Sequence, residues 1–403
     1  MPTPYTHANN ARLQRLTRPL YAYAVCQELI LLYPVYTLLF AHHGLSTTQI
    51  SSLFVIWSLT SVLLALPTGT WADLVPRRHL LALGPLLTGT GFTLWLLAPS
   101  YPAFAAGFVL WGTGSTLVSG TLEALVHTEL DHRGAPDHYT RLMGRTSALE
   151  VASAGTATLL AVPAMAHGGY TTVGAASVTV CALGALTALA LPEQRPTTTP
   201  DQNPHPDPGY TATLRAGLHQ ARTSRPVRSA LLLLVVATVF WQSLEEYIPL
   251  LASDSGVAPA TVPAVMLLVW AFVTIGGLTA ARAARWPRPL LGLALIAATL
   301  AAGTGAHLGT WGGWALLGAG FAIYQVLAVV ADARLQEAIT GRARATVTSL
   351  AGLGTDAVAI GTYAGYAGLI TGLGHPAVFT LFMLPYAAVG LTVLAPARTR
   401  NTT

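Results

Sequence analysis

The stretch Gly69-Thr-Trp-Ala-Asp73-Leu-Val-Pro-Arg77-Arg78 decides how the rest of the chain is interpreted. An apolar run that begins near Ser46 ends in it, and a second apolar run starts directly after it at His79. One acid and two adjacent arginines therefore stand in a short turn between two segments of membrane length. Charged groups there are costly unless the turn lies at the membrane surface and the charges have partners. We expect this stretch to be such a surface turn.

The composition is typical of an integral membrane protein. Hydrophobic residues make up 53% of the 403 residues and charged residues only 9%, whereas a soluble domain carries about 25% charged residues. The mean hydropathy is +0.54. The length gives room for about a dozen spanning helices of roughly 20–25 residues. Cys26 and Cys181 both lie inside apolar runs, which argues against a disulfide framework or a zinc site.

Apolar runs predict twelve transmembrane helices in two groups of six. The runs lie at about 19–41, 47–71, 79–98, 102–126, 140–166, 170–192, 228–252, 257–281, 288–306, 310–334, 345–370 and 375–396. The polar, proline-rich segment between the two groups is typical of a flexible linker. The predicted parts are an N-terminal tail, an N-terminal half, a cytoplasmic linker, a C-terminal half and a C-terminal tail, at residues 1–18, 19–192, 193–227, 228–396 and 397–403. The predicted fold class is an all-α integral membrane protein.

Positive charge is confined to one side of these predicted spans. All 21 basic side chains are arginines, and each lies in a tail, in the linker or at a turn that follows an even-numbered span. The turns near residues 43, 100, 168, 255, 308 and 373 have none. By the positive-inside rule, both termini are cytoplasmic and the protein lies in a bacterial cytoplasmic membrane. The isoelectric point near 9.4 therefore reflects topology, and nucleic-acid binding is not expected.

The opening stretch resembles the loop signature of the major facilitator superfamily, which has a glycine, an acid four residues later and then a basic cluster. The matching residues are Gly69, Asp73, Arg77 and Arg78. The resemblance implies that these four form a conformational latch, in which Asp73 meets the start of the eleventh span. It also implies a twelve-helix fold of two homologous halves that gives alternating access to a central site. A repeat supports the two halves, because Gln27 and Pro34 have the same spacing as Gln242 and Pro249.

Polar side chains within the spans are the candidates for chemistry. A carboxylate at membrane depth is expensive and usually faces protein or water. The candidates for proton coupling or for the substrate cavity are Gln27, Glu28, Glu123, Glu150, Glu245, Glu246, Gln325 and Asp356. The deepest acids are Glu28, Glu150 and Asp356. In span four, Ser115, Ser119, Glu123 and His127 recur every four residues, which predicts one polar stripe on a single helix.

Each candidate also has a simpler interpretation. Glu123 lies near the cytoplasmic end of its span, where it can pair with Arg77 or Arg78. One of Glu245 and Glu246 can lie at the membrane surface. The three deepest acids can make buried structural hydrogen bonds instead of binding protons.

The balance of charge favours transport of protons or cations. A cavity lined by acids, without arginine, attracts cations and repels anions. Burial favours the protonated form of a carboxylate, so that a deep acid can bind and release a proton as the cavity opens alternately to each side. The chain carries no recognisable catalytic constellation, and an enzyme is not expected. No metal or cofactor is predicted, and the proton gradient is the expected energy source.

Among branches of the superfamily, the chain is most similar to the bacterial drug and metabolite exporters that work by proton antiport. The predicted function is therefore proton-coupled efflux of a small organic molecule, cationic or aromatic, by a monomer in the lipid bilayer. One alternative is a proton-coupled importer of a small polar nutrient, which a tightly hydrogen-bonding cavity would favour. A second alternative is a membrane sensor or scaffold without transport, against which the deep acids argue.

Overall fold

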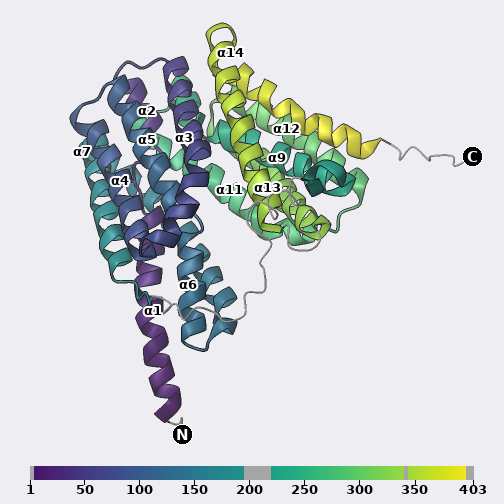
Figure 1. The fold of residues 1–403 in the computed structure, drawn as a ribbon. Helices are drawn as coiled ribbons and strands as arrows, with labels where there is room; N and C mark the ends of the chain where they lie inside the picture. The colour runs from purple at the N-terminus through teal and green to yellow at the C-terminus, as the bar shows by residue number, and fades with distance from the viewer. Residues whose placement is uncertain (1–3, 195–218, 340–343, 396–403) are drawn as a thin grey trace, which may run out of the picture. The chain divides into compact units, whose positions relative to one another are not determined.

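The computed structural model describes the backbone of residues 4–194, 219–339 and 344–395, and their side chains except those of 4–13, 65–74 and 344–345. The described residues form helices joined by short turns (Figure 1). This architecture confirms the all-α prediction. The chain divides into two compact units, Met1–Asp201 with Pro259–Ala264, and Gln202–Ala258 with Val265–Thr403.

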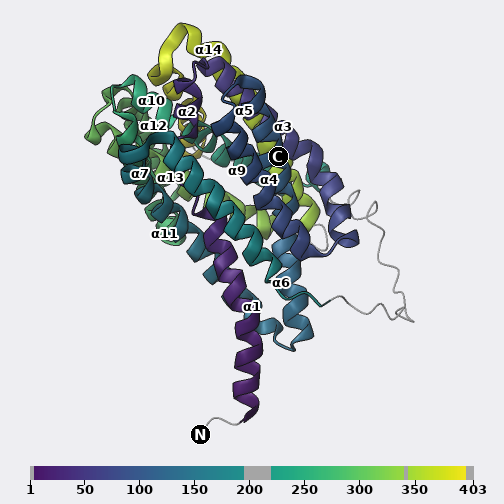
Figure 2. The same ribbon diagram turned by 90° about the vertical axis from the view of Figure 1, so that its left-hand side faces the viewer.

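The N-terminal unit is a bundle in which α4 packs against both α5 and α7, while α1 packs against α7 and α3 against α5. Its elements are α1 (Pro4–Glu28), α2 (Tyr36–His42), α3 (Thr47–Leu74), α4 (Arg77–Leu97), α5 (Tyr101–Val118), α6 (Thr121–His132), the 3-10 turn η1 (Pro136–His138) and α7 (Tyr139–Leu189). In both views the first turns of α1 extend beyond the other helices of this unit (Figure 1, Figure 2).

In the C-terminal part of the chain, α14 packs against α12 and α9, and α13 packs against the same two helices. The elements are α9 (Arg225–Glu245), α10 (Ile248–Asp254), the 3-10 turn η2 (Pro259–Thr261), α11 (Val262–Ala283), α12 (Arg288–Leu308), α13 (Trp311–Ala338) and α14 (Arg344–Leu394).

Within the described residues, 8 helices are long and apolar enough to cross a membrane. The helices α7 and α14 each cover two predicted spans that meet at a glycine, Gly169 with φ 58° and Gly374 with φ 72°. Glycine adopts this left-handed backbone without the steric cost that a Cβ would add. The total of twelve spans stays a prediction.

Three predicted spans are interrupted rather than continuous. The first breaks between α1 and α2, the fourth between α5 and α6, and the seventh between α9 and α10. Proline lacks an N–H and clashes with the carbonyl of the preceding turn, which explains the breaks at Pro34 and Pro249. At the fourth span, Gly120 has φ +74°. The spacing repeat seen in the sequence therefore coincides with a repeated helix break.

Candidate functional site

A cavity of about 220 Å³ lies in the N-terminal unit where α1 ends. Its walls come from α1, α4, α5, α7 and the breaks that follow α1 and α5. The lining residues are Cys26, Gln27, Glu28, Ile30, Tyr33, Gly84, Pro85, Thr88, Trp111, Gly114, Ser115, Val118, Ser119 and Cys181. The break after Glu28 brings both the end of α1 and the following turn into one wall. Two predicted site residues, Gln27 and Glu28, therefore share this cavity.

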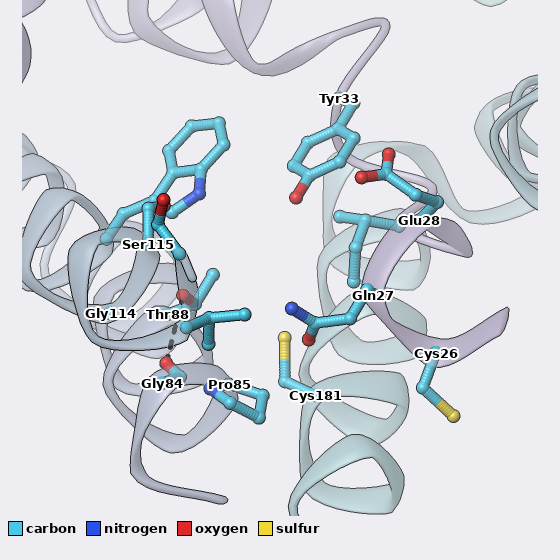
Figure 3. Close-up of a pocket in the computed structure, with 14 residues that line it drawn as sticks. Cys26, Gln27, Glu28, Tyr33, Gly84, Pro85, Thr88, Gly114, Ser115 and Cys181 are labelled. Carbon is cyan, nitrogen blue, oxygen red and sulfur yellow. Dashed lines mark hydrogen bonds between the residues drawn. The ribbon is translucent and has the colours of Figure 1, made fainter. Parts of the chain in front are cut away.

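Polar groups converge on this space from several helices. Figure 3 shows the Gln27 amide, the Tyr33 hydroxyl and the Cys181 thiol pointing into it, whereas the Cys26 thiol points away. The Glu28 carboxylate lies next to Tyr33 (Figure 3). An amide, a phenol and a carboxylate can together donate and accept hydrogen bonds and balance one positive charge.

Aromatic rings form one wall of the cavity. The Tyr33 and Trp111 rings are stacked with centroids 5.3 Å apart and 10° between their planes. Trp111 stacks in turn on Trp57, with centroids 4.9 Å apart. Aromatic faces attract cations, so this wall complements the Glu28 carboxylate. Trp95 and Tyr324, by contrast, are fully buried.

The wall opposite α1 depends on a close approach of α4 and α5. A Cβ added to Gly114 would lie 2.6 Å from the carbonyl oxygen of Gly84, and one added to Gly84 would lie 2.5 Å from Cγ2 of Val118. These distances leave no room for a side chain at either position. The two glycines thus set the distance between α4 and α5, and α5 carries Trp111 and Ser115.

Carboxylates extend from the cavity toward α6. Glu28 on α1 interacts electrostatically with Glu150 on α7, and Glu150 does so with Glu123 on α6. Tyr23 interacts with both Glu150 and Glu123, and its hydroxyl donates to the Leu81 carbonyl oxygen at 3.1 Å. The structure thus brings together four predicted residues of the N-terminal half, namely Gln27, Glu28, Glu150 and Glu123.

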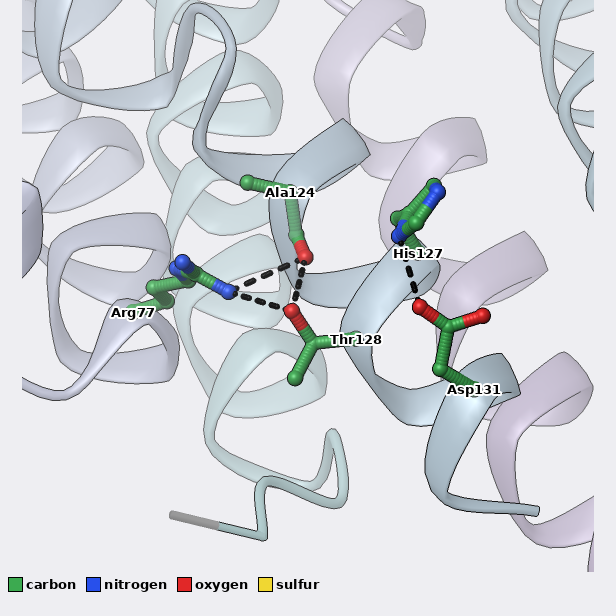
Figure 4. Close-up of polar contacts among 5 residues, drawn as sticks. All are labelled: Arg77, Ala124, His127, Thr128 and Asp131. Atoms are coloured by element: carbon green, nitrogen blue, oxygen red, sulfur yellow. Dashed lines mark hydrogen bonds and ion pairs between the residues drawn. The ribbon is translucent and has the colours of Figure 1, made fainter. Parts of the chain in front are cut away.

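The single polar stripe predicted for span four is wrong. Because α5 ends at Val118 and α6 begins at Thr121 after the positive-φ Gly120, the four residues do not share one helix face. Ser115 and Ser119 line the cavity. His127 instead pairs with Asp131 in its own helix, 3.1 Å from Nδ1 to Oδ2 (Figure 4).

The C-terminal unit has its own group of acids at the break after α9. Glu245 is the last residue of α9, and its carboxylate accepts a hydrogen bond from the indole N–H of Trp270 on α11. Glu246 follows in the break, and both side chains are half-buried. The buried Tyr363 of α14 interacts electrostatically with Glu245, Glu246 and Asp356. Asp356 and Tyr363 lie on the same helix, α14.

Gln325 lies at a different contact between helices from this acidic group. It lies on α13 beside α11, where a Cβ added to Gly277 would be 3.7 Å from its Nε2. The C-terminal unit thus gathers Glu245, Glu246 and Asp356 around one tyrosine and places Gln325 at a different helix contact.

Two of the four latch residues begin α4. The Arg77 guanidinium donates from Nη1 to the Ala124 carbonyl oxygen at 3.0 Å and to Thr128 Oγ1 at 2.8 Å (Figure 4). Arg77 therefore reaches α6, but among the described contacts its guanidinium donates to Ala124 and Thr128 and not to the Glu123 carboxylate. The side chain of Asp73 and the surroundings of Gly69 lie outside the described residues, as do the side chains of Arg344 and Ala345 where span eleven starts.

Sequence reasoning missed Glu193, which it had assigned to the flexible linker. Its carboxylate accepts backbone hydrogen bonds from Arg77 N at 2.7 Å and Arg78 N at 3.2 Å. The next residue, Gln194, donates its backbone N–H to the buried Glu129, which also pairs with Arg133 at 2.8 Å. An acid directly after the last apolar run of the half was the available signal. The beginning of the linker is thus tied to α4 and α6.

The arrangement defines a class of protein, a multi-pass helical membrane protein with carboxylates at breaks in its helices and an internal cavity. Residues 25–363 match the family model of the Major Facilitator Superfamily. The chain belongs to this superfamily of membrane transporters. No curated protein sequence matches the chain.

Solved structures of transporters share the fold. The nucleoside transporter NupG, in a mutant form, superposes with a TM-score of 0.75 at 11% identity, over 93% of this chain and 98% of that chain. A D-xylose–proton symporter gives 0.67 at 13% identity, over 95% and 96%. A bacterial homologue of the iron transporter ferroportin, in an inward-facing state, gives 0.65 at 16% identity, over 98% and 100%. At such identities these likenesses establish the fold alone.

Proposed function

We propose that the protein is a proton-coupled secondary transporter that exports a small organic cation by alternating access. The observation that supports this most is the N-terminal cavity, in which the Glu28 carboxylate stands beside the stacked rings of Tyr33 and Trp111. A carboxylate next to an aromatic face suits a flat or cationic organic compound. The absence of arginine from this cavity lining disfavours an anionic substrate.

Proton coupling is assigned to the row of acids. Glu28, Glu150 and Glu123 interact in sequence from the cavity to α6, and Glu245, Glu246 and Asp356 surround Tyr363 in the other unit. A carboxylate that exchanges its proton for a cationic substrate keeps the charge of the cavity balanced in both states. This exchange is the physical basis of antiport, and Glu28 is the residue placed to perform it.

Arg77, Arg78, Gly69 and Asp73 are proposed as a latch that holds one state of the cycle. The Arg77 contacts tie α4 to α6, and α6 carries Glu123. A movement of the end of α4 that carries Arg77 would therefore be transmitted through α6 to Glu123. No resident cofactor is part of this mechanism, and one chain holds both halves, so that a monomer suffices.

A second candidate is proton-coupled import of a small polar solute. The cavity is compact, about 220 Å³, and its Gln27, Thr88, Ser115 and Ser119 side chains offer hydrogen bonds. The D-xylose–proton symporter has the same fold. In this candidate Glu28 binds the proton that enters together with the solute.

The two candidates are separated by a vesicle experiment. Everted membrane vesicles with an acidic interior, followed with a pH-quenched dye, receive organic cations, antibiotics and small sugars or nucleosides one at a time. Loss of the pH gradient on addition of a cation, only in vesicles that contain the protein, supports export. A response to polar solutes that appears only as uptake in right-side-out vesicles supports import. If no compound in either orientation gives a response that depends on the protein, the proposed proton coupling is wrong.

A further inference from the structure

A buried histidine in the C-terminal unit has no part in the proposed function. His375 follows Gly374, the glycine at which the two spans of α14 meet, and it is 4% exposed. Its Nε2 lies 3.6 Å from Oδ2 of Asp254, the last residue of α10. Its Nδ1 is hydrogen-bonded to the Tyr366 hydroxyl. The imidazole therefore lies between two groups. One is the Asp254 carboxylate, whose side chain is 65% exposed, and the other is the buried phenol of Tyr366.

The phenol continues into a row of buried tyrosines. The Tyr366 and Tyr247 rings are stacked with centroids 3.7 Å apart. The Tyr247 centroid is 6.2 Å from that of Tyr363, the residue that interacts with the acids at the break after α9. His375 thus lies between the exposed carboxylate of Asp254 and a group of packed tyrosine rings within one unit.

Two titratable side chains, those of Asp254 and Tyr366, are in contact with His375. Asp254 faces it from α10 and Tyr366 from α14, with Tyr247 packed behind Tyr366. At the neighbouring end of α12, His307 instead donates from Nδ1 to the Gly303 carbonyl oxygen of its own helix at 2.9 Å. Asp254 is therefore the acid that would stabilise a positive charge on His375.

We propose that His375 is a proton-binding site of the C-terminal half, reached through Asp254 and sensed by Tyr366. The neutral ring carries its hydrogen on either nitrogen, so Tyr366 accepts from Nδ1–H in one tautomer and donates to Nδ1 in the other. In the Nδ1–H tautomer, a hydronium ion on the Asp254 side transfers its proton to the lone pair of Nε2: one O–H bond breaks, one N–H bond forms and a water molecule is left. The imidazolium carries N–H groups on both nitrogens. Nε2–H then pairs with Asp254, and Nδ1–H donates to the Tyr366 oxygen. Both ring nitrogens are then donors, so Tyr366 can only accept from the ring and its hydroxyl hydrogen points away from it.

This site would make α10 and α14 respond to pH at the end of the unit where the sequence has no arginine. When His375 is neutral, its contact with Asp254 lacks the attraction of opposite charges, and Tyr366 is free to donate or accept. When His375 is charged, the ion pair ties the end of α10 to the turn inside α14. The inference goes beyond the proposed transport function, because protonation of His375 can be measured without any substrate.

The test uses the full-length protein with nitrogen-15-labelled histidine in lipid nanodiscs. Nitrogen NMR between about pH 5 and pH 9, the range in which histidine changes charge, distinguishes the two neutral tautomers from the cation. The signal lost in His375→Gln belongs to His375. We expect it to change from neutral to cationic as the pH falls, and to do so at lower pH in Asp254→Asn, which removes the stabilising carboxylate. Tyr366→Phe should shift the Nδ1 signal of His375. The control His307→Gln should leave the Nδ1 and Nε2 signals of His375 unchanged.

Two results would overturn the proposal. One is a His375 signal that stays neutral across the whole range, and the other is a titration that is the same in the wild type and in Asp254→Asn. If His375→Gln does not fold, the exposed position of Asp254 makes its variant the safer one, and the signal that moves in Asp254→Asn then identifies His375. A failure of the vesicle experiment above would leave this result untouched, so the two proposals fail separately.

Discussion

The Glu193 carboxylate acts as the cap of α4 from a position far along the chain. Pro76 stands at the N-cap of α4 and makes no side-chain cap hydrogen bond, so the first N–H groups of the helix need another acceptor. Glu193 accepts from two of them. A negative charge at this place also interacts favourably with the helix dipole. One side chain thereby joins the last span of the N-terminal half to its third.

Removing this cap should destabilise the protein without touching the cavity. We expect Glu193→Ala to lower the free energy of unfolding by about 1–2 kcal/mol, the usual cost of losing an N-cap, which thermal unfolding in detergent would detect as a lower midpoint. The matched control is Glu337→Ala, because Glu337 is an exposed acid near the end of α13. Equal midpoints for the two variants would show that Glu193 is not a cap.

Residues of the candidate site differ in how easily the sequence reveals them. Glu28 was predictable because a carboxylate inside an apolar run is conspicuous, and Gln27 lies beside it. Glu193 carried a signal in its position after an apolar run, but the partners of Glu193 and Glu129 were not predictable, because they include backbone N–H groups distant in sequence. His375 was missed for a similar reason, since only the fold brings Asp254 and Tyr366 to it.

At the scale of helices, hydropathy predicted where spans lie but not where they break. A window of apolar residues continues unchanged through the turn that separates α1 from α2 and the one that separates α9 from α10. The signals were Pro34 and Pro249, which appeared in the sequence only as a spacing repeat. Because Glu28 and Glu245 each end the helix before such a break, the breaks position the acids on which the proposed function rests.

The contact between α4 and α5 gives a prediction at the same scale. Gly114→Ala should cost about 1–3 kcal/mol, as overpacking does, because its Cβ would lie 2.6 Å from the Gly84 carbonyl oxygen. Gly155→Ala is the control, since nothing lies within 4 Å of a Cβ there. Thermal unfolding of both variants checks this. The close packing of α4 on α5 would be contradicted if Gly114→Ala were as stable as the wild type.

At the scale of the whole molecule, the distribution of arginine predicts the topology. We expect both termini in the cytoplasm, because the arginine-bearing turns and tails all lie on one side of the predicted spans. A fluorescent protein that matures only in the cytoplasm, fused to the C-terminus, should be bright. The same fusion made at the turn after Leu308 should be dark. The opposite pattern would refute the predicted orientation, and equal brightness would refute the count of spans.

The superfamily was predictable from one turn, whereas the substrate was not. The spacing of Gly69, Asp73, Arg77 and Arg78 is a local property of the sequence. The family match confirms the superfamily that this spacing predicted. Substrate choice depends instead on how Gln27, Tyr33 and Ser115 converge from separate helices, which no linear pattern encodes. The structure supplies that convergence.

In the proposed mechanism Glu28 couples solute movement to protons, and transport in proteoliposomes tests this role. Purified protein in proteoliposomes is given a compound found in the vesicle screen, and its accumulation under an imposed pH gradient is compared with its exchange at equal pH. The wild type should do both. Glu28→Gln, which keeps the shape but cannot release a proton, should still exchange the compound but lose accumulation driven by the gradient. The control Asp137→Asn, at an exposed acid of the same half, should behave as the wild type. If Glu28→Gln accumulates the compound as well as the wild type does, the account of this cavity is wrong.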